Sequence, residues 1–153
     1  MPELTDQVTT TLIATVDATA AAMVWAPHSL TDMPDIVEPV RRGVDTVLSG
    51  RTPTAADRPA WELTRRVVAQ TLRLYPPTWF LIRVTTVATE SAGQHISVGI
   101  TLVGSPCLIH HRGDPRPDPE RFDPGRHGGP PHRAVMLPLR GGVPFSPSAA
   151  TWP

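Results

Sequence analysis

The sequence predicts a mainly helical fold with a small antiparallel β-sheet and a proline-rich meander. Three observations support this. Helical patterns bounded by proline or glycine fill the first half of the chain. Residues 79–104 are rich in β-branched and aromatic side chains on both sides of the turn sequence Ser-Ala-Gly-Gln. The chain has 19 prolines among its 153 residues, and prolines and glycines are concentrated after residue 112.

The first predicted helix covers about residues 4–26 and mixes alanine with threonine and valine. Because threonine and valine are weak helix formers, we expect burial against other parts of the protein to hold it. It is expected to end at Pro27. Its most apolar stretch, residues 12–26, carries Asp17. That stretch is too short and too polar to span a bilayer, so we expect no membrane contact.

The second predicted helix covers about residues 33–49. Thr31 or Asp32 is expected to cap its N-terminus, and Pro34 falls in the first turn, where proline is tolerated. Gly50 is a natural stop for the helix, because glycine readily takes the left-handed conformation at a helix end.

The third predicted helix covers about residues 58–75, with Asp57 as its expected cap and an end before Pro76. Gln70 and Arg73 lie three residues apart on it and therefore share one face. A carboxylate is the usual partner of a guanidinium at this spacing. The pair is either a buried polar contact or two solvated side chains.

The remaining segments are shorter. Antiparallel strands are expected within about residues 79–104, followed by one more helical turn within 105–113. Residues 112–134 show no periodicity and are expected to form a meandering coil, and 135–153 an irregular tail.

Composition excludes several classes of protein. The net charge is zero, which argues against nucleic acid as a partner. Cys107 is the single cysteine, so no internal disulfide is possible and a reducing cytoplasm is expected. The N-terminal residues lack the pattern of a signal peptide. All basic residues are arginine and asparagine is absent, which is typical of a GC-rich bacterial gene.

Four blocks, taken in order, resemble the C-terminal part of a cytochrome P450, a heme-thiolate monooxygenase. The blocks are LIATVDATAAAMVWA, QTLRLYPPTWFLIR, SPCLIHHRGDPRPDPERFDP and MLPLRGG. They are similar to the distal helix over the heme, the Glu-x-x-Arg helix with its following strand, the segment ending in Pro-Glu-Arg-Phe, and the approach to the cysteine loop. The resemblance implies a partial P450-like domain over residues 1–134 and a degenerate cysteine-loop region over 135–153.

The resemblance assigns a structural motif to Gln70, Arg73 and Arg121. In the family, a helix glutamate pairs with the two arginines and locks the meander to the core. Glutamine brings no charge, so two guanidiniums would share one neutral partner, and we expect a loosened site. Glu62 or Glu120 could replace the missing acid.

The resemblance also implies a heme cofactor and residues around it. Asp17 matches the distal acid, a candidate catalytic residue, but Ala18 stands where the family has a threonine. Arg83 matches a strand arginine that binds a heme propionate. Two residues argue against heme binding, because a serine, Ser146, falls at or near the position of the ligand cysteine and Cys107 lies before the meander.

No metal site is expected from the residues themselves. None of the histidines shows a zinc-ligand spacing. The six are His28, His95, His110, His111, His127 and His132.

Three functions remain open. The first is a truncated P450-like protein that has lost heme-thiolate monooxygenase activity. The second is a heme-binding oxidoreductase or monooxygenase of the P450 family, completed by a second P450-like chain and served by an unspecified redox partner. The third is a heme-free P450-derived partner protein or small cyclase-type enzyme, expected to form a homo-oligomer.

Overall fold

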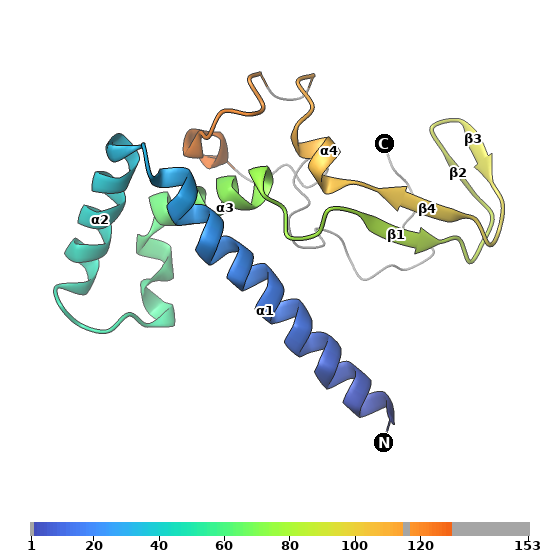
Figure 1. The fold of residues 1–153 in the computed structure, drawn as a ribbon, viewed down its shortest axis with the longest axis horizontal. Helices are drawn as coiled ribbons and strands as arrows, with labels where there is room; N and C mark the ends of the chain where they lie inside the picture. Colours follow the sequence, from blue (N-terminus) through green and yellow to red (C-terminus); the bar gives the residue numbers. More distant parts are fainter. Residues whose placement is uncertain (1, 115–116, 130–153) are drawn as a thin grey trace.

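The computed structural model describes residues 2–114 and 117–129 and confirms the predicted fold class. Helices dominate the first half of the chain, and a small antiparallel β-structure follows them (Figure 1). The helical elements, in order, are α1 (Pro2–Leu30), α2 (Pro34–Leu48), the 3-10 helix η1 (Ala55–Ala60), α3 (Glu62–Leu74), α4 (Pro106–His110) and the 3-10 helix η2 (Pro124–His127).

Helix α1 differs from expectation at its C-terminal end, because it continues through Pro27 to Leu30. The hydroxyl groups of the last turn explain how the end is held. Ser29 donates to the carbonyl of Trp25 at 2.7 Å, and Thr31 donates to the carbonyl of Pro27 at 3.2 Å. The Trp25 ring also stacks on Tyr75, with 4.3 Å between ring centroids. The predicted stop at Pro27 is therefore wrong.

The expectation that α1 is buried is also wrong for the described residues. Leu12, Val16 and Met23 keep 61%, 63% and 71% of their surface exposed. In Figure 1 the N-terminal part of the helix extends away from α2 and α3. By length and composition alone, Leu4–Leu30 would suffice to cross a membrane, since the helix continues well beyond the apolar stretch 12–26.

Helix α2 begins after Met33, with Pro34 at its first position, so the predicted caps Thr31 and Asp32 are wrong. The rigid φ of proline starts this helix without a side-chain cap. The helix ends at Leu48, and its C-cap is Ser49, which has a φ of 47° in the left-handed region and stands one residue before the expected glycine.

Asp57 caps a different helix from the predicted one. Its carboxylate accepts from the backbone N–H of Thr54 at 2.8 Å, and the two residues form the capping box of η1. Helix α3 starts later, after Trp61, and ends before Tyr75.

The described strands form two separate antiparallel pairs. Strand β1 (Leu81–Val84) pairs with β4 (Thr101–Gly104), and β2 (Thr89–Ser91) pairs with β3 (Gln94–Ile96). The predicted turn joins β2 to β3.

The core of the described chain is small and lies around α3. Val67, Leu74 and Phe122 are buried there, against partly buried side chains of α1 and α2 such as Leu30 and Ile36. Phe122 comes from the meander, and η2, also in the meander, packs along α3. The apolar contacts of the meander thus bring its backbone against the polar face of α3.

Candidate functional site

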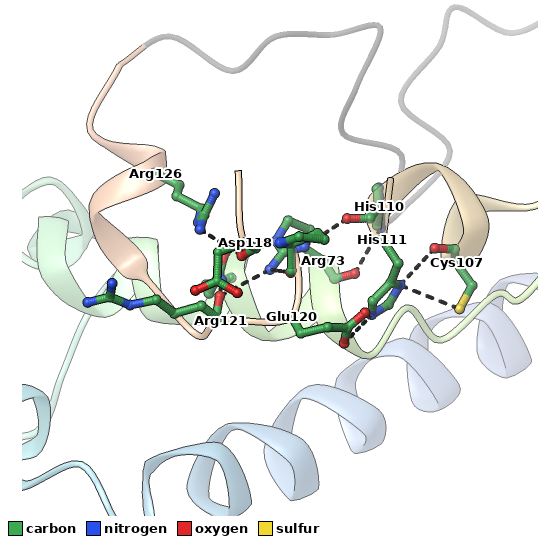
Figure 2. A network of polar contacts seen from close by, with 10 residues as sticks. Arg73, Cys107, His110, His111, Asp118, Glu120, Arg121 and Arg126 are labelled. Carbon is green, nitrogen blue, oxygen red and sulfur yellow. Dashed lines mark hydrogen bonds and ion pairs between the residues drawn. The ribbon is translucent and has the colours of Figure 1, made fainter. Parts of the chain in front are cut away.

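A buried polar cluster, called the clamp below, joins α3 to α4 and to the meander (Figure 2). It consists of the side chains of Gln70, Arg73, His110 and His127 and the backbone carbonyls of Pro119 and Arg121. Helix α3 supplies Gln70 and Arg73 from one face, as their spacing predicts.

Arg73 is the centre of the clamp and is fully buried. Its Nε donates to Gln70 Oε1 at 3.0 Å, and its Nη1 donates to the carbonyl of His110 at 2.8 Å. Its Nη2 donates to the carbonyl of Pro119 at 2.7 Å and, more weakly, to that of Arg121 at 3.4 Å. One guanidinium therefore binds three chain segments through its fixed fork of donors.

Gln70 is also fully buried, which excludes the solvated alternative. Its Nε2 donates to the carbonyl of Arg121 at 2.9 Å. Its Oε1 accepts from Arg73 and lies 3.0 Å from Nε2 of His127. Because an amide oxygen can only accept, Nε2 of His127 must carry a hydrogen.

His110 completes the clamp from α4. Its side chain is fully buried, and its Nδ1 lies 3.0 Å from the carbonyl of Arg73. Since that carbonyl can only accept, Nδ1 carries the hydrogen, and the two residues bind each other reciprocally. Sequence reasoning missed His110 and His127 as clamp members, because only the fold brings them to α3.

The structure brings Gln70 and Arg73 together but leaves the Arg121 side chain outside. Arg121 contributes its carbonyl, while its guanidinium is directed away from Arg73 (Figure 2). Neither candidate acid replaces a glutamate here. Glu62 pairs with Arg65 at 2.6 Å, and Glu120 lies 3.6 Å from His111.

An ion pair on the outer part of α3 supports the clamp from the side. Hydrogen bonds from Arg65 and then Arg66 lower the pKa of Glu62 to about 2. Arg65 Nη2 also donates to the carbonyl of His127 at 3.2 Å. Glu62 therefore orients an arginine that holds the end of η2 in place.

The other predicted site residues lie elsewhere. Asp17 is exposed on α1. Arg83 is exposed on β1 and donates to the carbonyl of its neighbour Ile82 at 2.8 Å. In the part of the chain that the structure describes, neither residue has a hydrogen bond or ion pair with the clamp.

The described residues do not fit the heme-thiolate group that the resemblance implies. Cys107 lies in α4, half-buried, with its Sγ 3.7 Å from Nδ1 of His111. The family's thiolate would instead follow the meander. Across residues 2–114 and 117–129, no group of three or more histidine, cysteine or acidic side chains is placed to hold a metal ion. Ser146 lies outside the described residues.

Comparison with known proteins identifies the origin of this arrangement. Residues 1–133 match the family model for cytochrome P450. The chain is 39% identical over 144 residues to cyclooctat-9-en-7-ol 5-monooxygenase of Streptomyces melanosporofaciens, an alignment that covers 92% of this chain and 31% of the relative. It is 36% identical over 124 residues to pentalenene oxygenase of Streptomyces avermitilis, covering 81% and 28% respectively. The chain thus spans about 30% of the length of these relatives.

The fold gives the same result. A zebra fish cytochrome P450 structure with abiraterone matches with a TM-score of 0.73 and 26% identity, covering 80% of this chain and 30% of that one. A structure of a zebra fish P450 with progesterone matches equally well. The resemblance based on the four sequence blocks is therefore confirmed, and this chain belongs to the cytochrome P450 family.

Proposed function

We propose that this chain is a P450-derived scaffold that does not carry out heme-thiolate monooxygenation by itself. The observation that carries the proposal is the position of its single cysteine. Cys107 precedes the meander and lies beside His111 in α4, whereas oxygen activation in the family uses a thiolate that follows the meander. A serine hydroxyl at position 146 is a poor iron ligand.

Two further departures support the loss of activity. Ala18 replaces the threonine next to the distal acid, so Asp17 has no neighbouring hydroxyl at that position for proton delivery. Gln70 replaces the helix glutamate, so the clamp differs in its chemistry from the family's motif. The clamp remains a structural element that holds the meander to α3.

The second candidate is a heme-binding oxidoreductase, favoured by the names of the relatives. One relative is a monooxygenase of cyclooctat-9-en-7-ol and another is a pentalenene oxygenase. Under this reading Arg83 binds a heme propionate, a ligand other than the usual thiolate binds the iron, and a redox partner supplies electrons.

The third candidate is a heme-free partner protein or small cyclase-type enzyme in the cytoplasm. The exposed apolar side chains of α1 favour it, because a large apolar surface on a protein is usually covered by a partner. Asp17 is the acid that such a catalyst would use.

Hemin titration of the purified chain separates the first two candidates. Absorption spectra of the ferric, reduced and CO-bound states are recorded for the parent and for Cys107→Ser and Arg83→Ala. We expect no saturable binding and no thiolate-type CO spectrum in a protein that circular dichroism reports as folded. Saturable one-to-one binding that Arg83→Ala weakens would support the second candidate, and a thiolate-type CO spectrum that Cys107→Ser abolishes would overturn the proposal.

A further inference from the structure

We propose that Gln70 is a fitted member of the clamp, with His127 as its positioning residue, so that the meander is locked by an amide instead of a carboxylate. The inference goes beyond the proposed function, because it does not depend on whether heme binds. It replaces the expectation of a loosened site.

The amide of Gln70 meets donors on one side and an acceptor on the other. Its Oε1 faces Nε of Arg73 and Nε2 of His127, both at 3.0 Å, while its Nε2 faces the carbonyl of Arg121 at 2.9 Å. Rotating the amide by 180° would place N–H groups against donors and oxygen against oxygen. The surroundings therefore fix its orientation.

A glutamate could not make the same contacts. A carboxylate has no hydrogen to donate, so one of its oxygens would lie against the Arg121 carbonyl in place of the present N–H. The Nη1 and Nη2 of the buried Arg73 donate to the carbonyls of His110 and Pro119. Because the Arg121 guanidinium is directed away from Arg73, it does not take the contact with position 70 that the resemblance assigns to it.

His127 supplies the side chain through which the meander contacts Oε1 of Gln70. It is the last residue of η2, and Asp123 holds the start of this 3-10 helix by accepting from the N–H of Gly125 at 2.9 Å. At the other end Arg65 binds the His127 carbonyl at 3.2 Å. The backbone around His127 is thus fixed from both sides, which directs its ring toward Gln70.

The first test is the isosteric substitution Gln70→Glu in the full 153-residue chain, with Gln94→Glu on the exposed strand β3 as its control. We expect Gln70→Glu to lower the folding equilibrium constant at pH 7 at least tenfold and to speed amide hydrogen exchange in residues 119–127. Gln94→Glu should leave both unchanged. A Gln70→Glu chain as stable as the parent, or more stable, would show that position 70 still suits an acid and would overturn the proposal.

The second test applies even if Gln70→Glu fails to fold. Nitrogen-15 NMR of the parent should show His127 with its hydrogen on Nε2, and a protected side-chain amide for Gln70. His127→Phe should speed exchange in residues 119–127 at least tenfold, whereas His127→Gln, which keeps an N–H donor, should recover most of the protection. An Nδ1–H tautomer, or equal exchange in both variants, would contradict the positioning role of His127.

Discussion

Arg73 illustrates how one side chain can hold several segments of this chain. Its donors point to acceptors on α3, α4 and the meander. A lysine ammonium carries its donors on a single atom and cannot span these directions. Arg73→Lys should therefore lower the free energy of unfolding by about 3 kcal/mol, the cost of breaking a buried charged network. Urea denaturation measures this change.

Arg42→Lys is the matched control for that experiment. Arg42 pairs with Glu38 at 3.5 Å, and both side chains are mostly exposed. Exposed pairs of this kind contribute little, so the change should stay within about 0.5 kcal/mol. Equal effects of the two substitutions would mean that the Arg73 contacts do not hold the fold.

Glu62 gives the protein a predictable acid sensitivity. Its pKa is lowered from an ordinary value of 4.5 to about 2 by hydrogen bonds from Arg65 and Arg66. A depressed pKa contributes stability that is present above pH 4.5 and is lost as the pH falls toward 2. We expect the midpoint temperature of thermal unfolding to drop as the pH falls from 4.5 toward 2. The drop should be smaller in Glu62→Gln. NMR titration of the Glu62 carboxylate checks the value itself, and a midpoint near 4.5 would contradict the ion pair.

At the scale of elements, the hairpin between β2 and β3 carries backbone strain that can be relieved. Ala92 has a φ of 50° and Gly93 a φ of 76°, the pattern of a two-residue turn that favours Asn-Gly. Ala92→Asn should therefore raise the free energy of unfolding of the hairpin by about 1 kcal/mol, because asparagine takes the left-handed conformation at a lower cost than alanine. Hydrogen exchange of the strand amides measures it. Ala88→Asn, outside the turn, is the control and should not give this gain.

The elements also show which local features of the sequence decide structure. The three helices, the strands around the Ala-Gly turn and the short helix after Ser105 were predictable, because hydrophobic pattern and turn chemistry are local. Helix ends were predicted less well. Pro27 did not stop α1, since side-chain hydroxyls and the stacking of Trp25 on Tyr75 hold its last turn. Asp57 caps η1 and not α3. The prediction missed this, because the sequence pattern does not distinguish a 3-10 helix from the first turn of an α-helix.

The clamp shows the same limit for a site. The spacing of Gln70 and Arg73 predicted a shared face, and the family resemblance pointed to the meander as their partner. The sequence did not reveal that Arg121 contributes a carbonyl and His127 a side chain. Those roles depend on how the meander backbone turns onto α3, and that path is set by contacts more than 50 positions apart, such as the one between Gln70 and His127.

At the scale of the whole molecule, the apolar surface of α1 is the main feature without a covering element in the described structure. Leu12 and Val16 are mostly exposed, whereas Trp25 near the other end stacks on Tyr75. A free helix rich in threonine and valine is marginally stable in water. The described fold therefore predicts a helix that is anchored at its C-terminal turns and frays toward its N-terminus.

Concentration should change this behaviour if a second copy covers α1. The chain has zero net charge, so long-range repulsion does not oppose association of two copies. Hydrogen exchange is compared at a concentration where ultracentrifugation reports a monomer and at one where it reports a larger species. We expect amides of residues 4–20 to exchange rapidly in the monomer and to gain protection on association, while residues 67–74 stay protected in both. The double variant Leu12→Gln/Val16→Gln should remain monomeric and unprotected over residues 4–20. Protection of these residues at every concentration would mean that α1 is stable alone, and fast exchange in the associated species would place the contact on another surface.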